Sequence, residues 1–261
     1  CIRDSNYKHR ILYYGPSSSK DLLATIDQYH QVPAALKDIP AGNEYPYLET
    51  PTTKVLIAPY EAKQIYMAQI SNLDKKYDPA IEPTRELYNE YFGGGMNSIV
   101  FQEMRETRGL AYSAWAGMLP PNYLKYPYTI RTQIATQNDK MIDAVNTFND
   151  IINNMPESEA AFKLAKEGLI NRMRTDRIIK SDIIWTYINA QDLGQNVDPR
   201  IKLYNDVQTM TLKDIVDFQK EWVKGRTYVY CILGDKKDLD MNKLKAVGPI
   251  EELTQQQIFG Y

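Results

Sequence analysis

Residues 92–112 read FGGGMNSIVFQEMRETRGLAY and hold the most distinctive pattern in this chain of 261 residues. The glycines at 93–95 follow a helical pattern over 83–92 and mark its end, because glycine stops helices readily. Residues 98–106 predict a second helix. The apolar and aromatic stretch at 111–117 then predicts a strand. We therefore expect a helix, a glycine stop, a second helix and a strand in direct succession.

The rest of the chain extends this pattern on both sides. Further strands are predicted at 54–58, 64–71, 126–134 and 227–233, the last of them taken as the final strand. Further helices are predicted at 138–153, 158–174, 181–193, 199–207 and from 211 onward. Strands followed by several consecutive helices and a closing strand are typical of α+β proteins. The predicted fold is a mostly antiparallel mixed sheet with several helices packed on one face.

The helix predicted at 138–153 has the clearest amphipathic pattern. Its apolar residues Met141, Val145 and Phe148 recur at intervals that place them on one side of a helix. We expect these three residues and Ile99 to share one core. Cys231, set among apolar residues, is interpreted as a small core residue and not as a nucleophile.

Composition excludes several classes of function. The chain has two histidines, His9 and His30, and two cysteines, Cys1 and Cys231. No CxxC or HxxxH spacing occurs, so neither a zinc finger nor a disulfide scaffold is expected. A net charge of −2 provides no electrostatic case for nucleic acid as the main partner. The longest apolar runs, about six residues, fall short of a membrane-spanning helix.

A short internal repeat suggests a duplicated protein. Residues 10–14 (RILYY) predict a buried strand that ends at Gly15 and precedes a helix, and residues 227–233 with Gly234 show the same order. We therefore expect residues 1–36 to be the last strand and helix of a preceding homologous domain, residues 37–53 a linker, and residues 54–261 a second copy. On this interpretation Cys1 marks the point where a longer chain was cut. The alternative is the acylated first residue of a bacterial lipoprotein.

The segment 92–112 resembles the second, non-catalytic domain of the pitrilysin or insulinase-like zinc peptidases, which include the mitochondrial processing peptidases. The matching residues are the glycines at 93–95, Ser98, Met104-Arg105-Glu106 and Gly109-Leu110-Ala111-Tyr112. The resemblance covers about residues 54–261. It implies two similar halves that face each other around a chamber, with zinc and an HxxEH motif on the catalytic half.

The same resemblance identifies two candidate substrate-binding residues. Arg105 and Tyr112 match the family's Arg and Tyr that reach across to the bound peptide near the zinc. A guanidinium can bind peptide carbonyls, and a phenol hydroxyl can stabilise a tetrahedral intermediate. The alternative for Arg105 is a surface ion pair with Glu103 or Glu106, and for Tyr112 packing in a strand.

The chain departs from the family at the catalytic motif. HxxEH occurs nowhere, and the corresponding helix segment reads RELYN at residues 85–89. We therefore expect no catalytic residue, metal ligand or cofactor in this chain, no peptidase activity from it alone, and zinc in a partner catalytic domain on the same chain or another subunit. The expected function is to close the chamber over an extended peptide.

Two other functions stay open. The first is a degenerate homologue that binds peptide or scaffolds a complex without hydrolysis. The second is a plain interaction protein that uses tyrosine-rich sheet edges, since the chain has 20 tyrosines.

Three arginines near the end of one predicted helix are Arg172, Arg174 and Arg177. We expect them to lie on a solvated helix face, which is favoured over a basic patch that lines the chamber. The resemblance suggests a bacterial periplasm or cell envelope as the location.

Overall fold

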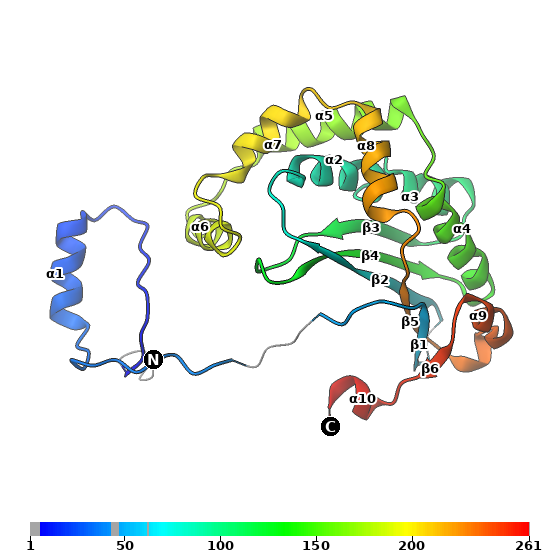
Figure 1. Ribbon diagram of the computed structural model, residues 1–261, viewed down its shortest axis with the longest axis horizontal. Coiled ribbons are helices and arrows are strands. Elements are labelled where there is room, and N and C mark those ends of the chain that lie inside the picture. Colours follow the sequence, from blue (N-terminus) through cyan, green and yellow to red (C-terminus); the bar gives the residue numbers. More distant parts are fainter. Residues whose placement is uncertain (1–5, 43–46, 62, 261) are drawn as a thin grey trace.

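A computed structural model describes residues 6–42, 47–61 and 63–260, and Cys1 lies outside these ranges. A six-stranded mixed sheet organises the chain from residue 54 onward (Figure 1). Its strands are β1 (Lys54–Pro59), β2 (Ile65–Lys76), β3 (Ser113–Leu119), β4 (Pro127–Thr136), β5 (Val229–Gly234) and β6 (Ile250–Glu252). The spatial order is β3-β4-β2-β5-β1-β6. The pairs β3–β4, β4–β2 and β2–β5 are antiparallel and β1 runs parallel to β5 and β6, so the predicted fold class is confirmed.

Helices cover one face of this sheet, as predicted (Figure 1). The helices with residues in the core are α2 (Glu82–Phe92), α3 (Ile99–Phe101), α4 (Met141–Asn153), α5 (Glu159–Thr175), α7 (Pro199–Val207), α8 (Leu212–Phe218) and α9 (Met241–Val247). Two more, α6 (Ile183–Asp192) and α10 (Gln255–Phe259), bury no residue, and α10 lies near the C-terminus apart from the helix layer (Figure 1). Two of the core helices continue into π-helical segments, which are Gln102–Thr107 after α3 and Gln219–Val223 after α8. In the part of the chain that the structure describes, no helix has the length and apolar character needed to span a bilayer.

The core lies between the sheet and these helices. Met141, Val145 and Phe148 of α4 are each at most 1% exposed, and Ile99 is 6% exposed in the same cluster, which confirms the predicted burial. On β2, alternate residues face this core. Gln69 is one of them, and it is held by hydrogen bonds with Asn149 and Thr132, both at 2.8 Å. A buried amide is tolerated here because both ends of its side chain are satisfied.

The end of α2 approaches the sheet more closely than any side chain would allow. A Cβ at Gly93 would lie 2.4 Å from the carbonyl oxygen of Ala116 on β3, whereas a Cβ at Gly95 would meet nothing within 4 Å. We expect Gly93→Ala to destabilise the fold by about 3 kcal/mol, the upper end of the range for overpacking, because backbone cannot yield as a side chain can. Gly95→Ala, the matched control, should stay within about 0.5 kcal/mol. Urea unfolding of both variants checks this, and equal midpoints would contradict it.

The amino-terminal residues 6–37 form a separate unit beside this domain, with α1 (Ser19–Tyr29) as its helix (Figure 1). The predicted helix is confirmed, and Ser18 caps it by accepting a hydrogen bond from the Asp21 amide at 3.2 Å. Residues 10–14, predicted as a strand, form none in this structure. Ile11, Tyr13 and Tyr14 are between 44% and 54% exposed and pair with no strand. A strand needs a neighbouring strand to satisfy its backbone, and the described residues provide none here.

Three smaller expectations also need correction. The final strand is β6 and not 227–233, because a three-residue edge strand with two exposed glutamates carries too little alternation to predict. The helix expected at 98–106 is α-helical for only one short stretch before it widens into the π-helical segment. Cys231 is half-buried on the helix-free face of the sheet and is not part of the helix-covered core.

Candidate functional site

Arg105 and Tyr112 lie side by side at one edge of the sheet. The guanidinium carbon of Arg105 is 5.8 Å from the centre of the Tyr112 ring and 5.0 Å from that of Phe101. Tyr112 is 72% exposed, and the Arg105 side chain is 45% exposed, with Glu106 3.6 Å away. Two residues seven positions apart thus present a cation and a phenol hydroxyl together to solvent, held by weak surface contacts only.

Local backbone structure brings the pair together. Arg105 belongs to the π-helical segment, a rare form that is frequent at functional sites. Met104 beside it is fully buried and anchors this segment to the core. Gly109 then turns the chain with a φ of +57°, a conformation that glycine adopts without strain. The Tyr112 amide donates to the Ala135 carbonyl at 2.9 Å, which fixes the start of β3, one of the two edge strands of the sheet.

Tyr112 also borders an apolar groove on the helix-free face of the sheet. The groove has a volume of about 560 Å³, and its lining includes Tyr66, Tyr112, Trp115, Cys231 and Leu233. Burial raises the pKa of the Cys231 thiol, so the thiol stays protonated at neutral pH and is a poor nucleophile. The sequence interpretation of Cys231 as unreactive therefore agrees with its surroundings, although its place in the fold was wrong.

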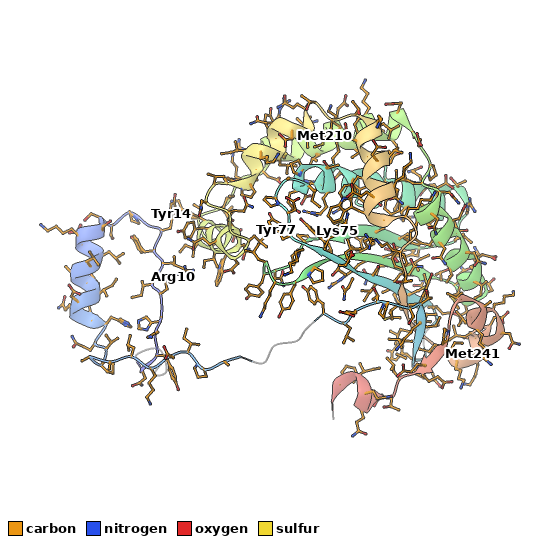
Figure 2. The ribbon with its side chains drawn as sticks, viewed as in Figure 1. Arg10, Tyr14, Lys75, Tyr77, Met210 and Met241 are labelled. Carbon is orange, nitrogen blue, oxygen red and sulfur yellow. The ribbon has the colours of Figure 1, made fainter. Side chains whose placement is uncertain are left out.

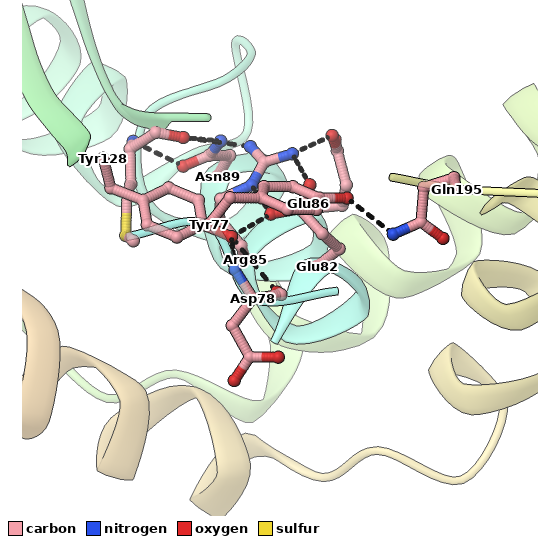
Figure 3. Close-up of polar contacts among 9 residues, drawn as sticks. Tyr77, Asp78, Glu82, Arg85, Glu86, Asn89, Tyr128 and Gln195 are labelled. Carbon is pink, nitrogen blue, oxygen red and sulfur yellow. Dashed lines mark hydrogen bonds and ion pairs between the residues drawn. The ribbon is translucent and has the colours of Figure 1, made fainter. Parts of the chain in front are cut away.

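The segment that corresponds to HxxEH is occupied by a buried arginine network (Figure 3). Arg85, 3% exposed, donates to both carboxylate oxygens of Glu82 at 2.8 and 3.0 Å, to Glu86 at 2.5 Å and to the Met118 carbonyl at 2.9 Å. Asn89 pairs with the Met118 amide and carbonyl on β3, at 2.8 and 2.9 Å. These contacts hold α2 against the sheet. They use the side chains of Arg85 and Asn89, the first and last residues of the RELYN segment.

The electrostatics of this network agree with a structural role. Burial lowers the pKa of Arg85, but the hydrogen bonds and charges of Glu82 and Glu86 outweigh it, so the pKa is raised overall. Burial, and next the charge of Glu82, raises the pKa of Tyr77 to about 12 and that of Tyr128 further. Across residues 6–42, 47–61 and 63–260, no three His, Cys, Asp or Glu side chains come together as metal ligands.

The arginines near the end of α5 are held by local partners. Arg172 pairs with Glu90 at 2.7 Å, Arg174 donates to the Tyr204 hydroxyl at 3.1 Å, and Arg177 donates to the Arg174 carbonyl at 2.8 Å. The first of these contacts pairs the arginine with a carboxylate and the other two are with neutral oxygens, and all three side chains are exposed to solvent. The solvated helix face is therefore the better description of these residues.

Sequence reasoning missed the groove itself. Tyr66 and Trp115 lie on β2 and β3, and each belongs to the alternating set that faces away from the helices. The period of two was visible in the sequence and could have indicated them. Whether the second face of the sheet is covered could not be read from that period, because it depends on where every helix packs.

Comparison with known proteins identifies the relatives of this chain. A family profile described as the peptidase M16 inactive domain matches residues 10–169. The chain is 28% identical over 218 residues to the "Non-peptidase homolog YmxG" of Helicobacter pylori, covering 78% of this chain and 48% of that protein. It therefore spans about half the length of the curated relative it matches.

Solved structures show the same fold. A peptidase M16 inactive domain from Pseudomonas fluorescens superposes with a TM-score of 0.63 at 17% identity, over 84% of this chain and 52% of that one. The periplasmic protease PqqL of Escherichia coli superposes with a TM-score of 0.60 at 14% identity, over 85% of this chain and 25% of that one.

Proposed function

Because the chain belongs to the peptidase M16 inactive domain family, we propose that it is the non-catalytic half of a zinc peptidase. In this role it closes a chamber over an extended peptide and supplies Arg105 and Tyr112 to a zinc site on another domain. The catalytic domain lies on the same full-length chain or on another subunit. A periplasmic or cell-envelope location belongs to the same proposal, since one structural relative is a periplasmic protease.

The observation that carries this proposal is the exposed pairing of Arg105 and Tyr112. Their side chains approach each other at the free edge of the sheet, and within the described residues they have no buried polar partner. A guanidinium there can donate to peptide carbonyls, and the phenol can donate to an oxygen that becomes negative in the transition state. The apolar groove next to Tyr112 provides further contact area for peptide side chains.

The proposed division of the chain follows from the same role. Residues 1–36 are the final strand and helix of a preceding homologous domain, 37–53 the linker and 54–261 the inactive domain. The exposed apolar side chains at 11–14 support this, because a strand that belongs to another sheet would leave them uncovered here. The family match, which begins at residue 10 and continues through the linker, is also consistent with it.

A second candidate function is peptide binding without hydrolysis. The curated relative is named a non-peptidase homolog, and RELYN replaces the catalytic motif in this chain. Under this alternative the same two residues hold a peptide, but no zinc site uses them. The two functions predict the same binding surface and differ only in whether an assembled partner cleaves the peptide.

Peptide binding to this chain tests the shared surface. We expect an extended, fluorescently labelled peptide to bind, and Arg105→Ala to weaken binding by roughly tenfold or more, since a hydrogen bond to a charged group contributes about 1.5–3 kcal/mol. Fluorescence anisotropy measures the affinity. Arg108→Ala is the matched control, because Arg108 is also half-exposed but pairs with Glu103 and Thr147. Equal affinities for the two variants would overturn the assignment of Arg105.

A further inference from the structure

The two histidines of the chain meet each other in the amino-terminal unit. His9 and His30 are 21 positions apart, and their Nε2 atoms lie 2.7 Å apart, with the rings nearly perpendicular. His9 is exposed and His30 half-buried, so both ring edges can be reached from solvent. Figure 1 shows the extended residues before α1 running alongside that helix. A separation of 21 positions matches no metal-ligand spacing, so the contact cannot be predicted from the sequence.

Backbone contacts hold both rings in place. Two backbone hydrogen bonds join the start of the amino-terminal unit to its end. The Lys8 N–H donates to the Lys37 carbonyl at 2.8 Å, and the Lys37 N–H donates to the Asn6 carbonyl at 2.9 Å. His30 caps the end of α1, and its amide bonds to the Ile26 carbonyl at 2.7 Å. The side chain of His9 is oriented separately, because its Nδ1 lies 2.7 Å from the Tyr7 carbonyl oxygen.

The contact with Tyr7 fixes the chemistry of the His9 ring. A carbonyl oxygen can only accept, so Nδ1 of His9 carries the proton, and in the neutral ring Nε2 holds a lone pair directed at His30. A histidine that donates from one nitrogen to a backbone carbonyl and offers the other is the usual arrangement of a metal ligand. Without a metal, the two Nε2 atoms are held together by one hydrogen bond, in which His30 donates its proton to the lone pair of His9.

We propose that His9 and His30 form a two-imidazole site for a divalent transition-metal cation such as Ni²⁺, Cu²⁺ or Zn²⁺. Imidazole suits these cations, whereas Mg²⁺ and Ca²⁺ prefer oxygen ligands. Metal–nitrogen bonds of about 2.0–2.1 Å place two ligand nitrogens about 3.3 Å apart in tetrahedral geometry. On metal binding the two Nε2 atoms therefore move about 0.6 Å further apart from their 2.7 Å distance, the proton between them is released, and water completes the coordination.

The two cationic side chains next to His9 in the sequence are engaged by other residues. The ammonium group of Lys8 is paired with Asp38 at 2.6 Å, and the Arg10 guanidinium donates to Gln191 of α6 at 3.1 Å. Figure 2 shows Arg10 and Tyr14 on the side of the extended segment that is toward α6. A bound metal would join the start of this segment to the end of α1. It would thereby close a loop of about 20 residues and stabilise the unit.

Metal titration of the whole chain tests the site. The background variant carries Cys1→Ser and Cys231→Ser, which removes the thiols as competing ligands. We expect isothermal titration with Ni²⁺ to show one equivalent bound at pH 7.5. Either His9→Ala or His30→Ala should weaken binding by more than the roughly 10–100-fold loss that follows removal of an outer-shell partner. Gln31→Ala, next to His30 and outside the contact, is the matched control and should bind as the background does.

A spectroscopic measurement separates this site from adventitious binding. With Cu²⁺, electron paramagnetic resonance should show two nitrogen ligands in the background variant and fewer in each histidine variant. Failure to bind one equivalent of Ni²⁺, or binding that both histidine variants retain, would overturn the proposal. Neither result bears on Arg105 and Tyr112, because peptide binding is measured without added metal.

Discussion

Tyr112→Phe should lower kcat/KM for peptide cleavage by about 10²–10³-fold in the assembly of this chain with its zinc-bearing half. This is the loss expected when one donor to a developing oxyanion is removed. The ring and its packing stay in place, and Tyr112 makes no buried contact through its hydroxyl, so the fold should be unaffected. Steady-state kinetics with a peptide substrate measure the effect, which should fall mainly on kcat because the oxyanion forms only in the transition state.

Matched variants make this result specific. Tyr60 is 59% exposed and directly follows β1, which lies four strands from β3 in the sheet, so Tyr60→Phe should leave kcat/KM unchanged. Arg105→Ala should raise KM as well as lower kcat, because a guanidinium that binds peptide carbonyls acts in the ground state too. Unchanged kcat/KM in both Tyr112→Phe and Arg105→Ala would remove the pair from the mechanism. An assembly that binds peptide and never cleaves it would instead favour the non-hydrolytic alternative.

Arg85→Ala should destabilise the domain by about 3–5 kcal/mol, the cost of removing one partner from a buried ion pair. The substitution leaves Glu82, whose side chain is 18% exposed, without its cation, and it leaves the Met118 carbonyl without its guanidinium donor. Among the described residues, Glu82 would keep the hydrogen bond from the Tyr128 hydroxyl at 2.7 Å. Urea or thermal unfolding followed by circular dichroism measures the free energy change.

An exposed arginine provides the control for this prediction. Arg172 is 48% exposed and pairs with Glu90 at a similar distance, yet Arg172→Ala should cost no more than about 1 kcal/mol because solvent screens the pair. Arg85→Lys should fall between the two, since an ammonium cannot reproduce the paired guanidinium contacts with Glu82. A loss below about 1 kcal/mol for Arg85→Ala would show that the network is not needed for stability.

Much of the fold could be predicted from local patterns. The strands β1 to β5 and the helices α2 and α4 to α8 lie where the periodicity and the capping residues placed them, within a few residues. Except for α6, which buries no residue, those elements bury one side against the core, so apolar residues recur in their sequences with a clear period. Two segments differ from the prediction because they bury no residue in this core. β6 is too short to show a period, and residues 10–14 carry the pattern of a buried strand with no sheet to join.

The candidate site could be predicted only in part. The resemblance indicated Arg105 and Tyr112, and the structure places them in contact, while their role stays a prediction. Glu82 lies outside the RELYN segment, and its bond to the Tyr128 hydroxyl depends on how α2 packs on the sheet. The groove depends on the absence of a helix over one face among the described residues. Neither feature is encoded at a fixed spacing in the sequence.

The fold class, the helix-covered core and the absence of the HxxEH motif can be read from the sequence, because each depends on residue identity at short range. Contacts between distant segments follow from the packing of the folded chain. This packing places His9 against His30 and Arg85 between two carboxylates, and among the described residues it leaves an apolar groove on one face of the sheet. The physical reason is that helix and strand periods specify which side of an element is apolar, whereas the partner of that side depends on the packing of the whole chain.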